Sequence, residues 1–124
     1  DGAFYQTDGE DSNIILRKCQ FADGAEPSGN AIHTENLLRL YQLTGDKRYL
    51  TQAEDCLKAV KEFLESYSPG YSYHVISLMR YYDEDAPTIV ISLNKTEDFL
   101  QELMEVIYSK FIPHKALIIR REDD

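Results

Sequence analysis

The sequence predicts a mainly α protein with a minor β part, an α+β fold. Apolar residues recur at spacings of three and four over residues 47–67, which is typical of an amphipathic helix. A near-continuous β-branched run occupies residues 88–93, which is typical of a strand buried on both faces, and residues 115–120 predict a second buried strand.

The composition changes at residues 83–87, Asp-Glu-Asp-Ala-Pro. We therefore divide the chain into residues 1–82, with a β-hairpin and helices, and residues 83–124, a small α/β cap. The 124 residues amount to about one domain, so we expect one compact body. Because the chain begins at Asp1 and not at methionine, we interpret it as a fragment of a larger protein.

The charge balance is acidic, with 22 acidic residues against 13 basic ones and a net charge of −9. The field of such a molecule repels a phosphate backbone, so we expect no nucleic-acid partner. No apolar run is suited to a signal peptide or a membrane span. We therefore expect no membrane partner.

Cys19 and Cys56 are far apart in the sequence, and neither belongs to a Cys-x-x-Cys motif or has histidines at metal-ligand spacing. This pattern predicts reduced, unpaired thiols in a cytoplasmic protein and no metal site. We expect no cofactor. A disulfide between the two cysteines is the less favoured alternative.

Residues 3–7 and 13–18 flank an acidic turn and predict a β-hairpin whose tip is solvated. The Asp-x-Asp-x-Asp-Gly order of a calcium loop is absent from the tip. A first helix should begin near Ser28, with Ser28 or Asn30 as its cap, and end at Gly45. Asp46 should cap a second, antiparallel helix. A third helix is predicted over residues 71–82.

In the cap, a helix over residues 96–110 separates the two predicted strands, so the strands should be parallel with a right-handed crossover. The loop Asn94-Lys95-Thr96 lacks the glycines that let a pyrophosphate approach a helix N-terminus. We therefore expect no nucleotide site there.

Polar residues of interest gather only around the start of the first helix, where Glu26, Asn30 and His33 could meet at the mouth of a pocket. In the functional hypothesis, His33 or Glu26 is an acid or base for a hydroxylated substrate and Asn30 donates a hydrogen bond to it. In the favoured structural alternative, Asn30 caps the helix, Glu26 is solvated and His33 is a partly buried ring. His74 is expected on a helix surface, and His114 is given no role.

Several segments together resemble the C-terminal part of the spermatogenesis-associated, thioredoxin-domain protein family. The most specific is Asp-Gly-Ala-Glu-Pro-Ser-Gly-Asn at residues 23–30, followed by Asn-Leu-Leu-Arg-Leu at 36–40. The resemblance covers nearly the whole chain, and its weaker parts are residues 1–7, 16–18, 43–46, 88–91 and 112–113.

In that family, a thioredoxin-like domain with a Trp-Cys-His motif precedes an α/α toroid similar to N-acylglucosamine epimerases and unsaturated glucuronyl hydrolases, which is a six-hairpin glycosidase-like fold. This chain has no such motif. The resemblance implies that it holds the last helical hairpins of the toroid plus the cap, and that residues 23–30 lie at the end where such folds bind sugars. The family usually has a glycine after the first cap strand, where this chain has Ser92-Leu93-Asn94.

Two functional hypotheses follow. In the favoured one, the chain has no complete active site and is a helical scaffold or interaction wall that packs on the remainder of its parent chain or on itself. In the alternative, it is part of a carbohydrate-processing toroid, epimerase-like or glycosidase-like, in which Glu26, Asn30 and His33 help to line a pocket for a sugar-like small molecule. Whether the parent protein is an enzyme stays open.

Overall fold

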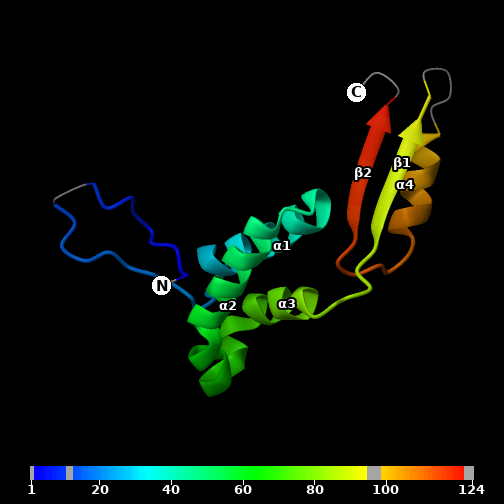
Figure 1. The fold of residues 1–124 in the computed structure, drawn as a ribbon. Helices are drawn as coiled ribbons and strands as arrows, with labels where there is room; N and C mark the ends of the chain where they lie inside the picture. Colours follow the sequence, from blue (N-terminus) through cyan, green and yellow to red (C-terminus); the bar gives the residue numbers. More distant parts are fainter. Residues whose placement is uncertain (1, 11–12, 95–98, 122–124) are drawn as a thin grey trace. The chain divides into compact units, whose positions relative to one another are not determined.

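The computed structural model describes residues 2–10, 13–94 and 99–121 (Figure 1). It is mainly helical with a small parallel sheet, which confirms the predicted fold class. The chain divides into two units, Asp1–Tyr82 and Asp83–Asp124. The first unit holds α1 (Gly29–Thr44), α2 (Lys47–Tyr67), the 3₁₀ helix η1 (Ser68–Tyr71) and α3 (Ser72–Tyr81). The second holds β1 (Thr88–Leu93), α4 (Leu100–Tyr108) and β2 (Ala116–Arg121).

Local signals in the sequence set the ends of α1 and the start of α2. Ser28 caps α1 because its Oγ accepts a hydrogen bond from the Ala31 N–H at 3.2 Å. Gly45 ends α1 in the left-handed conformation, with φ of 71°. Asp46 then caps α2 by accepting from the Arg48 N–H at 3.0 Å. The predicted start of the helix near Ser28, its end at Gly45 and the cap at Asp46 are confirmed. The alternative in which Asn30 caps α1 is wrong, because its side chain bonds Phe4 and Gln20 instead.

The core of the first unit forms where α1 packs against both α2 and α3. Four buried apolar residues make its centre, and Tyr49, Leu50 and Tyr81 pack around them: Leu37, Leu38, Ala53 and Cys56. The helices α2 and α3 contact each other far less than either contacts α1. A groove is therefore left between α2 and α3.

An ion pair buried between α1 and α3 adds a polar link to this core. Arg80 Nε lies 2.7 Å from Glu35 Oε1, and the side chains of both residues are at least nine-tenths buried. The Arg80 guanidinium also donates to Gln42 Oε1 at 2.7 Å. Because a buried charge without a partner costs several kcal/mol, this pairing fixes how α3 lies on α1.

The predicted N-terminal β-hairpin is wrong as a pair of strands, since the structure contains no strand in residues 2–10 or 13–27. The two segments are joined by a backbone hydrogen bond from Gln6 N to Lys18 O at 3.0 Å. Ile15 and Leu16 are strongly exposed, so the pair has no apolar face to bury. A two-stranded hairpin without a packed face is only marginally stable.

In the second unit, β1 and β2 pair in parallel, as predicted, with Thr88 opposite Ala116 and Leu93 opposite Arg121. The helix α4 lies beside this sheet (Figure 1) and is shorter than the predicted residues 96–110, of which residues 96–98 lie outside the described part. The start of the sheet is held by His114, whose Nδ1 lies 2.7 Å from Asp83 Oδ2.

The predicted burial of the first strand on both faces, and of the second strand, is wrong. Along β1 the buried residues Ile91 and Leu93 alternate with exposed ones, and the last three residues of β2 are exposed. The described residues of this unit contribute one helix to cover the sheet, so they leave one face uncovered. Within the described part of the chain, no helix combines the length and the apolar character needed to cross a membrane.

Candidate functional site

The loop that leads into α1 is organised by the carboxylate of Asp23. Its Oδ1 accepts from the Ser28 N–H at 2.9 Å, and its Oδ2 accepts from the Tyr73 N–H at 2.8 Å. The backbone N–H of Asp23 donates to Gly70 O at 2.9 Å. Asp23 therefore closes its own loop and ties that loop to the first turn of α3.

His74 lies beneath this loop and is fully buried, so the predicted surface position is wrong. The error arises because α3 turns this side chain toward α1, where its Nε2 lies 3.4 Å from Ser28 Oγ. Burial lowers the pKa of His74, and the nearby charge of Asp23 and the backbone of Phe21 oppose that shift only in part. The ring is therefore held neutral near pH 7.

Ser28, His74 and Asp23 have the residue types of a hydrolase triad, but their geometry is that of a core polar cluster. Ser28 Oγ already accepts the capping hydrogen bond of α1, and Ser28 is 3% exposed. Both oxygens of Asp23 accept from backbone N–H groups. No substrate can reach a serine in this position without unfolding the helix start.

Asn30, the first predicted site residue, is 4% exposed and joins three parts of the chain. Its Oδ1 accepts from the Phe4 N–H at 2.7 Å, and its Nδ2 donates to Phe4 O at 3.0 Å and to Gln20 O at 2.9 Å. The amide is thus used to hold two extended segments against the first turn of α1.

His33 and Glu26, the other two predicted site residues, lie in different surroundings. The centroids of the His33 and Phe4 rings are 3.8 Å apart. The Nε2 atom of His33 is buried and has no hydrogen-bond partner in the described chain. Burial lowers the pKa of His33. Glu26 is exposed, and its carbonyl accepts from the Gly24 N–H. Among the residues that the structure describes, no hydrogen bond joins Glu26, Asn30 and His33 to one another.

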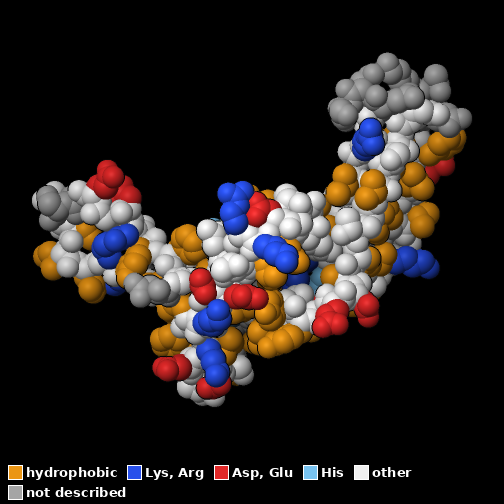
Figure 2. Space-filling model, in the orientation of Figure 1, with side chains coloured by type: hydrophobic (Ala, Val, Ile, Leu, Met, Phe, Trp, Pro, Cys, Tyr) orange, Lys and Arg blue, Asp and Glu red, His pale blue; other side chains and the backbone are white. Residues whose placement is uncertain are grey.

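Sequence reasoning missed the groove between α2 and α3. It has a volume of about 460 Å³, an apolar floor and a charged rim. Figure 2 shows apolar side chains beside basic and acidic ones over these helices. The lining residues are Glu54, Leu57, Lys58, Lys61, Leu64, Glu65, Leu78, Tyr81 and Tyr82. The seven-residue spacing of Leu57 and Leu64 is present in the sequence, but it predicts only an apolar helix face.

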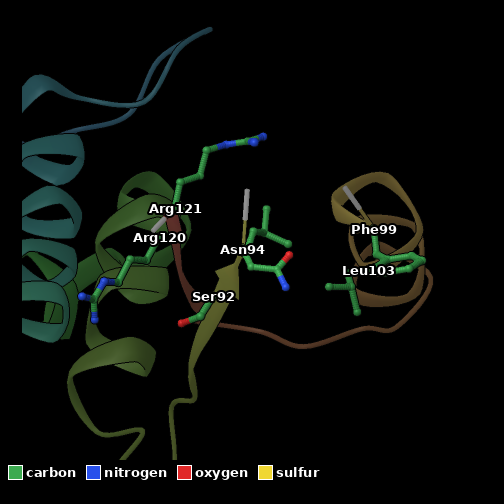
Figure 3. Close-up of a pocket in the computed structure, with 7 residues that line it drawn as sticks. Ser92, Asn94, Phe99, Leu103, Arg120 and Arg121 are labelled. Carbon is green, nitrogen blue, oxygen red and sulfur yellow. The ribbon is translucent and has the colours of Figure 1, made fainter. Parts of the chain in front are cut away.

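A second hollow, of about 420 Å³, lies where β1 and β2 end (Figure 3). Its lining combines apolar, amide, hydroxyl and guanidinium groups: Ser92, Leu93, Asn94, Phe99, Leu103, Arg120 and Arg121. The described residues contain no group of three or more His, Cys, Asp or Glu side chains that could hold a metal ion.

Comparison with known proteins places these features in a family context. The chain is 28% identical over 123 residues to spermatogenesis-associated protein 20 of rat and of human, and 25% identical over 122 residues to the uncharacterized protein B0495.5 of Caenorhabditis elegans. Each match covers 98% of this chain but only 16–17% of the relative. No protein-family model and no solved structure matches the chain. The chain is therefore homologous to spermatogenesis-associated protein 20 and corresponds to the C-terminal part of that family, as the sequence motifs predicted.

Proposed function

We propose that this chain is a helical scaffold, an interaction wall without a complete active site of its own, and that the groove between α2 and α3 is its docking face. The groove carries the proposal because its floor is apolar and no described element of the first unit fills it. Leu57, Leu64 and Leu78 supply the floor. An amphipathic helix is the partner that such a groove accepts.

The rim of the groove supports a helical partner that carries charges of both signs. Lys58 and Lys61 offer positive charge, and Glu54 and Glu65 offer negative charge. The Tyr81 hydroxyl donates to Glu54 Oε1 at 3.0 Å, which links α3 to α2 at the rim. Exposed tyrosines are common at interfaces because they combine a large apolar surface with a polar end. Tyr82, 72% exposed, fits that role.

The partner helix belongs to the remainder of a longer, cytoplasmic parent chain. The homology supports this assignment, since the curated relatives are much longer than the part that this chain matches. In the proposed arrangement, the helices of the first unit close the last part of an α/α toroid, and the rest of the toroid covers the groove. A second copy of the chain is the competing occupant.

The test combines the 124-residue chain with the rest of the human relative, expressed without its matching part. We expect co-purification, and we expect Leu78→Asp to weaken it at least tenfold, because a carboxylate would then face the groove floor. Ile76→Asp is the matched control, because Ile76 is exposed on α3 and does not line the groove. Equal binding by the wild-type chain and both variants, together with a monomer that binds no apolar dye, contradicts the proposal.

A second candidate function is one wall of a sugar-processing pocket that contains Glu26, Asn30 and His33. The observation that favours it is the buried His33 Nε2, which has no partner in the described chain and belongs to the helix that follows the loop with the exposed Glu26. Soaking the assembled protein with sugars tests this function. Glu26→Gln and His33→Gln should each weaken sugar binding, and unchanged binding in both variants rejects it.

A further inference from the structure

Another groove of the first unit runs beside the extended segment of residues 16–22. It has a volume of about 460 Å³. It is lined by these seven consecutive residues, by Phe63 of α2 and by Tyr71 of η1. Because every residue of the segment lines it, the groove follows the chain for roughly 20 Å, the length of seven extended residues.

One backbone edge of this segment is held by the protein itself. The Lys18 carbonyl accepts from the Gln6 N–H at 3.0 Å, and the Gln20 carbonyl accepts from Asn30 Nδ2 at 2.9 Å. Successive residues of an extended chain turn their N–H and C=O groups to opposite edges. The N–H groups of residues 17, 19 and 21 therefore belong to the other edge, and within the described chain they donate no hydrogen bond. A row of unpaired N–H groups is a template for a further strand.

Aromatic rings form the apolar part of the groove. The centroids of the Phe21 and Phe63 rings are 5.4 Å apart in a stacked arrangement, and those of the Phe63 and Tyr71 rings are 5.8 Å apart. Phe63 remains 42% exposed, so the described residues leave part of this row of rings uncovered. When a peptide extends a sheet edge, its backbone bonds to the edge and alternate side chains pack in such pockets.

The charge of the groove is positive, although the whole chain has a net charge of −9. Its charged lining residues are Arg17 and Lys18, and none of the described lining residues is acidic. The Arg17 guanidinium is already used in part, since it donates to Thr7 O at 2.9 Å and lies over the Tyr5 ring. The Lys18 ammonium has no ion pair or hydrogen bond within the described chain. A carboxylate of a partner complements this charge.

We propose that residues 16–22 bind an acidic, extended segment of a partner protein as an added β-strand. Its backbone pairs with the edge at residues 17, 19 and 21, an apolar side chain packs on Phe63 and Tyr71, and a carboxylate lies beside Lys18. The backbone pairing supplies affinity, while the rings and the lysine select the sequence. This proposal is independent of the docking groove between α2 and α3.

The test titrates the 124-residue chain with a fluorescent seven-residue peptide in which glutamate alternates with valine and phenylalanine. Anisotropy should show saturable binding, and NMR should show shifts of the amide signals of residues 16–22. Methylation of the peptide nitrogens at one alternate set of residues should weaken binding at least about tenfold, and methylation of the other set should matter much less, because a strand pairs through one edge. A peptide with lysine in place of glutamate should bind more weakly.

Lys18→Glu should weaken binding of the glutamate peptide by about fivefold and strengthen binding of the lysine peptide. Lys47→Glu is the matched control, because Lys47 is exposed in the same unit and does not line the groove. Phe63→Ala should weaken binding with unchanged circular dichroism. Leu78→Asp should leave binding unchanged, because Leu78 lines the other groove.

Three results would overturn the proposal. The first is equal affinity of the unmodified peptide and both methylated peptides, which would exclude strand pairing. The second is an equal loss in Lys18→Glu and Lys47→Glu, which would reduce the effect to net charge. The third is a dimer of the free chain that Lys18→Glu dissociates and the peptide does not, which would make a second copy the occupant.

Discussion

The side-chain amide of Asn30 holds the backbone of Phe4 at both of its polar groups. Oδ1 accepts from the Phe4 N–H at 2.7 Å, and Nδ2 donates to the Phe4 carbonyl at 3.0 Å. This pairing imitates the exchange of two hydrogen bonds between neighbouring strands. It attaches an extended segment to the first turn of a helix, where no strand is present to pair with it.

Replacing Asn30 with alanine should therefore destabilise the first unit by about 2–4 kcal/mol, because three hydrogen bonds to backbone groups are lost and those groups lose a partner. Urea unfolding followed by circular dichroism measures the loss. Asn36→Ala is the control, since Asn36 is exposed on the same helix. A loss below about 0.5 kcal/mol in Asn30→Ala, comparable to a surface substitution, would contradict this role.

The ion pair between Glu35 and Arg80 makes a second prediction. Arg80→Met leaves the Glu35 carboxylate buried without its cation, and its Oε2 already has no partner in the described chain. We expect a loss of about 3–5 kcal/mol, and we expect the double variant Glu35→Leu/Arg80→Met to recover most of it.

Arg39→Met provides the comparison for this pair. Arg39 also lies near Glu35, at 3.7 Å, but its side chain is 57% exposed. Its loss should cost less than about 0.5 kcal/mol, because exposed ion pairs contribute little. A double variant as unstable as Arg80→Met would show that the buried charge is not the cause of the loss.

The sequence predicted those features that depend on residues close together in the chain. The start of α1 near Ser28, its end at Gly45 and the cap of α2 at Asp46 depend on residues within a few positions, so they were predicted correctly. The parallel pairing of β1 and β2 also followed from the order of strand, helix and strand.

The features that sequence reasoning missed depend on distant partners. The role of Asn30 requires Phe4 and Gln20, which come from separate segments. His74 is buried because of how α3 lies on α1, and a helix of ten residues with mixed apolar spacing does not reveal its inner face. The groove exists because α2 and α3 both pack on α1 while contacting each other little, and no single segment encodes that.

The buried histidines predict that stability depends on pH. Burial lowers the pKa of His74 and of His33 in the folded state, so the unfolded chain takes up protons first as the pH falls below about 6.5. Their contribution to stability is complete above that pH and is lost below it. Because folded His74 stays neutral, the free energy of unfolding should fall by up to about 2 kcal/mol between pH 6.5 and pH 5.

Urea unfolding at pH 7.5 and pH 5.0 measures this dependence. His74→Gln cannot take up the proton, so its stability should fall less between the two pH values than that of the wild-type chain. His33→Gln should show a smaller difference, because His33 is only partly buried. Identical pH dependence in the wild-type chain and in His74→Gln would reject the assignment.

The two cysteines should differ strongly in reactivity. Both are free thiols, but Cys56 is 1% exposed while Cys19 is partly exposed. Burial raises the pKa of the Cys56 thiol, and a hydrogen bond with Thr34 opposes the shift only in part, so little thiolate is present near pH 7.

A thiol reagent such as dithionitrobenzoate should modify Cys19 quickly. It should modify Cys56 only when the core opens, at least about a hundredfold more slowly. Cys56→Ser should remove the slow phase alone, and Cys19→Ser the fast phase alone. Equal rates, or a disulfide in the untreated protein by mass spectrometry, would contradict this assignment.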